Sequence, residues 1–474
     1  MERARRAGRS LRPSYLPVAL GGAEVSAQSP DIAVHPLVII GSGFASFCLV
    51  AHLLETHAVK ATDITIIGPH PFGHGAAYSA THGDYRLNVR AQIMRIFSGQ
   101  PDDFLNWAAT ELEDNEAHNP QGAFYRRSDF ARYLSYLSKR IEGFDALNFM
   151  DMQVASLAQH KQCWQLNLTN GDSLMADQLV LATGNPPPRW PCEVSASLSA
   201  ERAVENPWSG KWLENIKTSD KIVFIGGGLT AMDGLYSLAN KAHEGKIEIV
   251  MPFAVLPPKQ TDWKIEPPVK WPDNIASASQ FLKFFSNTLG SRNWTAPAWQ
   301  SRFEALRINL NAVWQGLDDT EKKRLLRYMG HWWQLARFRS APQNFEAAQA
   351  MMNKGQLQLI KGRVSGLKKQ EAKLLVQLQD GGTLSADKAV NCTGPAGCPL
   401  ILKLLKAGII APDFSQRSAR IASDFKVLDG QKKPYDNLYA LGAMTASSLG
   451  DVIGAGTIAK QAESLAASLA PLFR

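Results

Sequence analysis

The 474-residue chain has few cysteines, and they are not grouped. Cys48, Cys163, Cys192, Cys392 and Cys398 are scattered and odd in number, which is typical of a protein from a reducing compartment. Five residues separate the closest two, whereas dithiol active sites normally have two intervening residues. No cysteines and histidines stand at zinc-site spacing, so we predict no metal centre.

A long uninterrupted apolar run is also missing. The most apolar long stretch, residues 36–54, contains Gly41, Gly43 and His52 and is better explained as a strand, a turn and a helix than as a membrane span. The N-terminus lacks the apolar core of a secretory signal. We therefore expect a cytoplasmic protein without a membrane partner.

The net charge of +8 is not spread along the chain. Five arginines within the first 12 residues, against Glu2, supply half of it. Residues 1–34 therefore predict a disordered basic tail, either a flexible arm or a segment resembling a transit peptide. The remaining charge is ordinary for a soluble protein of this size, so we predict no nucleic-acid partner.

Two glycine-rich turns, 185 residues apart, each follow an apolar strand-like run. They read LVIIGSGFAS from Leu37 and IVFIGGGLTA from Ile222. Gly41 and Gly226 permit a tight strand-to-helix connection. Gly43 and Gly228 let a pyrophosphate approach backbone N–H groups at a helix N-terminus. Helix-like and strand-like segments follow both turns, ending at Gly68 and Met251, so each belongs to a βαβ unit.

The pattern predicts an α/β fold with two Rossmann-like, three-layer dinucleotide-binding domains and a helical insertion rich in tryptophan. We place an FAD-binding domain at 35–190 and 385–474, an NAD(P)-binding domain at 200–260 and 351–384, and the insertion at 261–350. Seven of the twelve tryptophans lie in the insertion, as substrate wall, lid or core. Arg337 and Arg339 near its end either face a cleft or are exposed helix-end charges.

Further candidates lie where loops reach the strand ends. Asn88 and Arg90 are candidates for bonding phosphate or ring edges, and Asp451 either binds a flavin ribityl chain or caps the helix that runs to Leu469. The predicted cofactor-binding residues are Gly41, Ser42, Gly43, Phe44, Ala45, Ala77, Tyr78, Asn88, Arg90, Gly184, Gly226, Gly228, Leu229, Thr230, Gly394, Gly442 and Asp451. We assign no catalytic acid or base.

Several blocks in order give the chain a family resemblance. They are Gly75–Ser79, Leu87–Arg90, Arg127 with Phe130 and Tyr133, Asn206–Trp208, Gly228–Ala231 with Asp233, Leu256–Pro257, Trp314–Gln315, Arg327–Pro342 and Asn391–Pro395. From about residue 35 to 470 the chain resembles the bacterial FAD-NAD(P)-binding flavoproteins of the YdhS type, which are distantly similar to flavin-dependent N-hydroxylating monooxygenases. The resemblance implies FAD in the first domain and a nicotinamide nucleotide near the second.

The chain also departs from this family at named positions. Gly68-Pro69 stand where an acid normally binds the FAD ribose, and Met251-Pro252 stand where relatives carry Ser-Arg, whose arginine would pair with a 2′-phosphate. Phe338 replaces a histidine between the two arginines, and Gly450-Asp451 replace Trp-Glu.

These features predict an FAD-dependent oxidoreductase of a small-molecule substrate, with the flavin reduced by NAD(P)H and reoxidised by oxygen or an organic acceptor; monooxygenation is one form of that reaction. The alternative is a catalytically inactive nucleotide-binding or sensing protein with the same fold. The sequence leaves the substrate, the choice between NADH and NADPH and the oligomeric state open.

Overall fold

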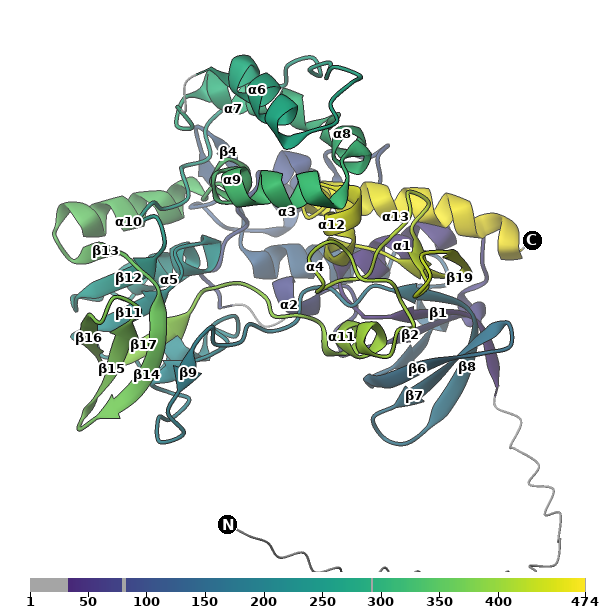
Figure 1. Cartoon of the computed structure of the whole chain (residues 1–474), viewed down its shortest axis with the longest axis horizontal. Helices are drawn as coiled ribbons and strands as arrows, with labels where there is room; N and C mark the ends of the chain where they lie inside the picture. Colours follow the sequence, from purple (N-terminus) through teal and green to yellow (C-terminus); the bar gives the residue numbers. More distant parts are fainter. Residues whose placement is uncertain (1–32, 79–81, 291–292, 474) are drawn as a thin grey trace, which may run out of the picture.

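Runs of β-branched and aliphatic residues form the centres of two sheets that lie on either side of the molecule, with helices above and between them (Figure 1). The computed structural model describes residues 33–78, 82–290 and 293–473. The predicted basic tail lies outside these residues except at its end, where the first strand already begins at Val34.

The first sheet has the strand order β18-β19-β8-β1-β2-β5, and β6 and β7 extend it as a meander from β8. β1 pairs in parallel with both β2 and β8, as a βαβ unit requires. The strands are β1 (Val34–Ile40), β2 (Ile64–Ile67), β5 (Asn148–Met150), β6 (Val154–His160), β7 (Cys163–Leu168), β8 (Ser173–Leu181), β18 (Lys426–Leu428) and β19 (Pro434–Ala440).

Alternating side chains of β1 bury both faces of this sheet. Leu37 and Ile39 pack with helices α1 (Phe44–Glu55) and α13 (Ala455–Leu469), whereas Val38 and Ile40 belong to a core shared with α11 (Pro399–Lys406). Period-two burial of a central parallel strand gives helices on both sides. The predicted α/β fold with a Rossmann-like three-layer arrangement is therefore confirmed.

The second sheet is wholly parallel, in the order β10-β17-β11-β12-β13. Helix α5 (Leu229–Asn240) covers one face, and a smaller four-stranded sheet, β16-β15-β14-β9, packs on the other. The strands are β9 (Glu193–Val194), β10 (Ala203–Val204), β11 (Ile222–Ile225), β12 (Ile247–Met251), β13 (Leu357–Lys361), β14 (Val364–Gln370), β15 (Lys373–Leu378), β16 (Thr383–Ala386) and β17 (Lys388–Asn391).

β17 is an inner strand of the second sheet, hydrogen-bonded between β10 and β11. The predicted division of the chain at residue 385 therefore falls within β16 of the smaller sheet and separates β17, which extends to Asn391, from the strands with which it pairs. The strand ending in Asn391-Cys-Thr-Gly394 is the counterpart of β8, which ends before Ala182-Thr-Gly184 in the first sheet.

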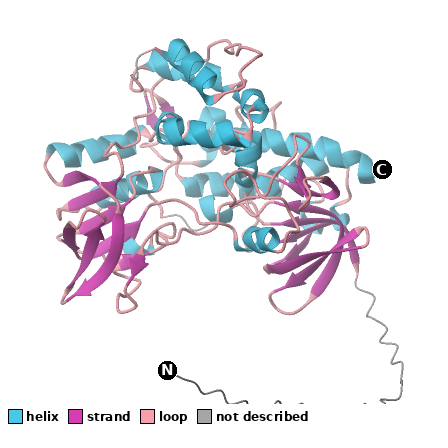
Figure 2. Ribbon diagram, in the orientation of Figure 1, coloured by secondary structure: helices cyan, strands magenta, loops and turns pink. Residues whose placement is uncertain are grey.

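Helices between the two sheets include a layer that crosses the top of the molecule (Figure 2). It contains α6 (Ala278–Leu289), α7 (Pro297–Arg307), α8 (Leu310–Gly316) and α9 (Asp319–Arg337). The next helix, α10 (Pro342–Asn353), instead packs beside α5. The remaining helices and the short hairpin are α2 (Gly75–Tyr78), α3 (Asp103–Glu111), α4 (Arg127–Ser138), α12 (Ala446–Leu449), β3 (His118–Asn119) and β4 (Gly122–Ala123). Within the described ranges, no helix is both long and apolar enough to cross a bilayer.

Buried charges join the two sheet-containing halves. Arg127, the first residue of α4, lies 3.5 Å from Asp233 of α5, and its guanidinium lies over the Trp208 ring. Asn344 of α10 donates a hydrogen bond to the same carboxylate at 2.8 Å. Burial raises the pKa of Asp233 to about 6, although Arg127 opposes the shift. A second buried guanidinium, Arg86, makes hydrogen bonds or ion pairs with Asp114, Glu116 and Tyr236 at 2.8–3.4 Å.

We predict that Arg127→Met lowers the free energy of unfolding by about 3–5 kcal/mol, because it leaves the Asp233 carboxylate buried without its cation. Urea denaturation at pH 7 measures the change. Arg132→Met, on the exposed side of the same helix, is the matched control and should change stability by less than about 0.5 kcal/mol. Equal effects of the two substitutions would contradict the role given to the pair.

Candidate functional site

The two glycine turns have the same backbone geometry. Gly41, after β1, has a φ of 113°, and Gly226, after β11, has a φ of 97°. The N-cap residues of the following helices, Gly43 and Gly228, have φ of −88° and −78° with ψ near −170°. The structure therefore repeats one strand-turn-helix device in both sheets, as the sequence predicts.

Each turn closes tightly against the neighbouring parallel strand. A Cβ atom on Gly41 would lie 2.2 Å from the carbonyl oxygen of Ala182, and one on Gly226 would lie 2.5 Å from that of Cys392. Both carbonyls immediately precede a Thr-Gly pair, which places Gly184 and Gly394 at the carboxyl edge of their sheets beside the turns.

The helices that follow the turns have open N-termini. Neither α1 nor α5 has a side-chain cap, and in the described part of the chain we find no acceptor for the N–H groups of Phe44, Ala45, Leu229 and Thr230. A Cβ on Gly228 would meet nothing within 4 Å, and one on Gly43 would meet only Gly75. Unpaired donors at the positive end of a helix dipole, with no side chain in the way, fit a pyrophosphate.

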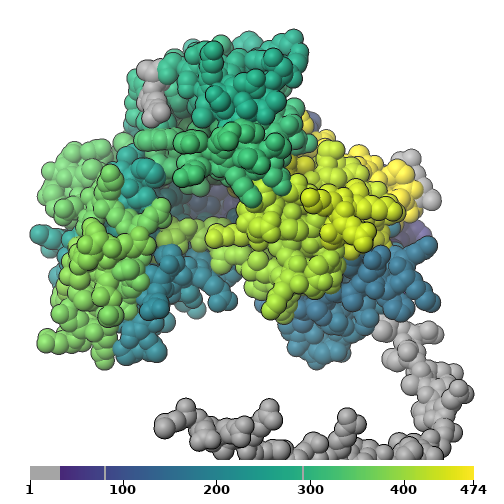
Figure 3. Space-filling model, in the orientation of Figure 1, coloured from purple at the N-terminus to yellow at the C-terminus, as the bar shows by residue number. Residues whose placement is uncertain are grey.

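The second turn opens into a cavity of about 630 Å³, called here the coenzyme cavity. In the space-filling view a recess lies beneath the helical layer, between the lobe of the second sheet and the C-terminal segment (Figure 3). Gly226, Gly228, Leu229, Thr230 and Gly394 line the coenzyme cavity, as do His331, Gln334 and Phe338 near the end of α9. The second set of predicted residues is thus brought together in one cavity.

The first turn is covered on one side by the segment after β2. The N–H of Gly73 donates to the carbonyl of Ser42 at 2.8 Å, and the Ser42 hydroxyl donates to the carbonyl of Pro69 at 2.5 Å. A Cβ on Gly68 would lie 2.8 Å from the Ser42 nitrogen, so no acidic side chain has room at the end of β2. This contact explains the missing ribose acid.

The other predicted residues of the first site differ in their environments. Tyr78 lies in the core against Phe44 and Phe130, and burial raises its pKa to about 12, while its neighbour Ala77 is half-buried. Asn88 is also half-buried. The Arg90 guanidinium lies 4.4 Å from the centre of the Trp263 ring, and its buried Nε has no hydrogen-bond partner among the described residues.

The C-terminal segment meets the first turn. A Cβ on Gly442, just after β19, would lie 3.0 Å from the Cβ of Ala45. Gly454, and not Asp451, is the N-cap of α13, and it provides no side-chain cap. The interpretation of Asp451 as a helix cap is therefore wrong. The N-terminus of α13 is thus also without a side-chain cap, and the helix packs along α1.

Asp451 belongs to a buried charge network with the helical layer. It accepts hydrogen bonds from Arg307 at 2.5 Å and from Arg337 at 3.0 Å, and its side chain is only 5% exposed. Burial alone would raise the pKa of Asp451, but the two arginines hold it below its usual value. Glu304 pairs with Arg307 and, at 2.9 Å, with Arg339. Arg337 and Arg339 are thus neither exposed nor free.

The charge network has one more cation than anions, with three arginines against two acids. One Arg337 nitrogen lies 2.7 Å from where a Cβ on Gly454 would stand, so the excess positive charge adjoins the N-terminus of α13.

Glu304 and Arg307 are absent from the predicted site. Their only sequence signal is an i,i+3 acid–base pair, which is typical of any solvated helix.

A second cavity, of about 350 Å³, lies between α8, α9 and the segment from Ala446 to Ile453. We call it the apolar cavity, because its wall consists mainly of aliphatic and aromatic side chains, among them Phe281, Trp314, Met329, Trp333, Phe414 and Ile453. Gln334 and Phe338 line both this cavity and the coenzyme cavity. The two cavities therefore share part of one wall.

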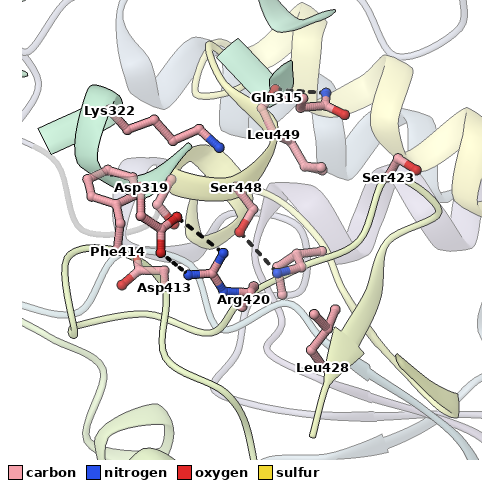
Figure 4. Close-up of a pocket in the computed structure, with 12 residues that line it drawn as sticks. Gln315, Asp319, Lys322, Asp413, Phe414, Arg420, Ser423, Leu428, Ser448 and Leu449 are labelled. Atoms are coloured by element: carbon pink, nitrogen blue, oxygen red, sulfur yellow. Dashed lines mark hydrogen bonds and ion pairs between the residues drawn. The ribbon is translucent and has the colours of Figure 1, made fainter. Parts of the chain in front are cut away.

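A polar pocket of about 300 Å³ adjoins the apolar cavity at Phe414 and Ser447. Figure 4 shows Arg420 directed at Asp319 within it, with the Lys322 amino group nearby. The hydrogen bond from Arg420 lowers the pKa of Asp319, and Lys322 lies over the Trp314 ring. Its charges already have partners in the protein, so we place the candidate site at the glycine turns.

Comparison with known proteins fits this geometry. Residues 38–186 match the family model described as FAD-NAD(P)-binding. The match contains the whole first glycine turn and ends two residues after Gly184. The predicted cofactors, FAD with NAD(P), are confirmed at this level. No curated protein matches the sequence.

Solved structures resemble the chain over nearly its full length. An ornithine N-hydroxylase from Kutzneria sp. 744, whose structure is described with reduced FAD, NADP+ and L-ornithine, is 14% identical with a TM-score of 0.59, covering 93% of this chain and 100% of its own. The cadaverine monooxygenase from Erwinia amylovora, bound to FAD, is 12% identical with a TM-score of 0.60, covering 91% and 94%. A bacillithiol disulfide reductase from Bacillus cereus is 13% identical with a TM-score of 0.52, covering 93% and 100%. At these identities the likeness shows the fold.

Substitutions at Gly226 and at Gly228, the first and last glycines of the second turn, are expected to have different effects. Gly226→Ala should lower the melting temperature, because its Cβ meets the Cys392 carbonyl and its positive φ disfavours alanine. Gly228→Asp should fold normally, since its Cβ meets open space, but should weaken NADP+ binding at least about tenfold by placing an anion beside the phosphates. Thermal denaturation and calorimetric titration separate the two effects, and unchanged NADP+ affinity in Gly228→Asp would exclude this turn as the nucleotide site.

Proposed function

We propose that this protein is an FAD-dependent oxidoreductase whose flavin takes a hydride from NAD(P)H and passes electrons to oxygen or an organic acceptor. The observation that supports it most is the repeated glycine turn with an uncapped helix in each of two sheets. When bound, the flavin supplies the redox chemistry, and the protein supplies binding, orientation and electrostatics. The likeness to N-hydroxylating enzymes makes monooxygenation the first reaction to test, and the ordered sequence blocks favour the YdhS-type subgroup.

The roles of individual residues follow from their positions. We assign the N–H groups of Phe44 and Ala45 to the FAD pyrophosphate, and those of Leu229 and Thr230 to the pyrophosphate of the nicotinamide nucleotide. The unpaired Nε of Arg90 provides a donor for an acceptor group of the bound flavin nucleotide.

The charge network acts on the electrostatics of the same region. Arg337, held by Asp451 beside the N-terminus of α13, adds positive charge to that of the helix dipole. Positive charge there favours electron uptake by a cofactor bound at this end of the helix. The positioning of Arg337 is therefore the role we assign to Asp451, in place of direct contact with the cofactor.

The purified protein is expected to be yellow and to bleach anaerobically on addition of NADH or NADPH, which absorbance near 450 nm records directly. A variant with Gly43→Asp should be purified without flavin, because its carboxylate would stand at the N-terminus of α1. A wild-type protein that takes up no FAD on reconstitution would refute the proposal. Bound FAD that neither nucleotide reduces would instead identify the inactive sensing protein.

A further inference from the structure

We propose that the apolar cavity is the substrate site and that it takes an uncharged, largely apolar molecule rather than a diamine, an amino acid or a carboxylate. This inference rests on the proposed function, because it supplies that function's substrate class. It departs from the ornithine and cadaverine named for the enzymes of similar fold.

The location of the cavity supports its role. Gly450, Asp451 and Ile453 at its edge immediately precede the N-cap of α13. On its other side it shares Gln334 and Phe338 with the coenzyme cavity. The apolar cavity is therefore bounded by the helical layer, by the segment that leads into α13 and by the wall that it shares with the coenzyme cavity. Its volume lies within the range of small-molecule sites.

The chemistry of the lining defines the ligand class. Asp451 is the one charged residue among the described residues that line the cavity, and its carboxylate is already paired with Arg307 and Arg337. An ammonium group would have to compete with two guanidinium groups that are fixed and buried. A carboxylate would lie against Asp451 and find no cation in the cavity wall, since none of the three arginines of the charge network lines the cavity.

Calorimetric titration of the purified full-length protein with 3-methylindole, tryptamine and indole-3-acetate tests the inference, because these probes share one ring system and differ in charge. L-ornithine and cadaverine complete the series. We expect 3-methylindole to bind at least about tenfold more tightly than any charged probe. Tighter binding of tryptamine, ornithine or cadaverine would overturn the inference, as would tighter binding of the carboxylate.

A substitution at Gly330 tests whether the ligand binds in the apolar cavity without unfolding the protein. It lies within α9 at the cavity wall, and its nearest neighbour to an added Cβ is Leu326 at 3.8 Å. Gly330→Leu should fill the cavity and abolish 3-methylindole binding while retaining or raising the melting temperature, since leucine favours a helix more than glycine does. Arg327→Leu, exposed on the same helix, is the matched control and should bind normally.

Unchanged 3-methylindole affinity in Gly330→Leu would place the site elsewhere. Since these titrations need no turnover, they separate the two proposals. A protein that binds 3-methylindole in this cavity but whose flavin is not reduced contradicts the proposed function and leaves the ligand class standing.

The carboxyl edge of the second sheet contains a residue that bears on the choice between NADH and NADPH. We infer that Arg363 selects NADPH by pairing with its 2′-phosphate. In a Rossmann-like unit the ribose of the adenosine lies at the end of the second strand, which here is β12. Met251 and Pro252 supply no charge at that position.

The neighbouring strand supplies the missing cation. β13 runs parallel to β12, so both end at the same sheet edge, and the N–H of Gly362 donates to the Met251 carbonyl at 3.0 Å. Arg363 follows directly and lines the coenzyme cavity together with Met251 and Pro252. Its exposed guanidinium has no ion pair or hydrogen bond with any described residue.

The rest of the coenzyme cavity wall is also suited to NADPH. Preference for NADH normally depends on an acid that accepts hydrogen bonds from the 2′-hydroxyl. None of the described residues lining the coenzyme cavity is aspartate or glutamate. A free guanidinium without a competing carboxylate is suited to a phosphate.

Titration with 2′,5′-ADP and 5′-AMP isolates the 2′-phosphate without involving the flavin. We expect 2′,5′-ADP to bind at least about tenfold more tightly, and Arg363→Gln to remove that difference while leaving 5′-AMP affinity within about twofold. Lys361 is exposed at the end of the same strand and lies outside the cavity wall. Lys361→Gln should therefore retain the preference for 2′,5′-ADP. Equal affinity for the two nucleotides in the wild type, or an unchanged preference in Arg363→Gln, would overturn the assignment.

Discussion

The arrangement of both proposed nucleotide sites depends on a close backbone contact that only glycine allows. At Gly41 and Gly226 the chain turns against a carbonyl oxygen of the neighbouring parallel strand, with no space for a Cβ atom. This contact fixes where each following helix begins and therefore where its unpaired N–H groups point. Because Gly43 and Gly228 face a more open space, each turn combines a rigid base with an accessible helix N-terminus.

The sequence predicts this device well, because its signal is local. Strand, glycine turn and helix are consecutive in the chain, and periodicity is enough to identify them. The central strands and both helices after the turns lie close to their predicted positions. The boundary at residue 385 illustrates the limit: Lys388–Asn391 becomes part of the second sheet through pairing with strands over 160 residues away in sequence, which no local pattern contains.

The roles of the charged residues were harder to predict, because their partners are distant in the sequence. Asp451 has two plausible interpretations in sequence, yet its partners come from α7 and α9, more than 100 residues earlier. Arg337 and Arg339 are candidates for binding a ligand in sequence, but in the structure they are buried against Asp451 and Glu304. Arg363 gives no signal at all in sequence, since its position matters only because β13 lies next to β12 in the sheet.

Helix α9 contributes to both cavities, with His331 facing the coenzyme side, Met329 and Trp333 the apolar side, and Gln334 both. A displacement of this helix by one ligand alters the wall seen by the other. By thermodynamic linkage, the factor by which bound coenzyme changes substrate affinity equals the factor by which bound substrate changes coenzyme affinity. One helix shared by two cavities thus gives the protein a means of cooperativity between two chemically different ligands.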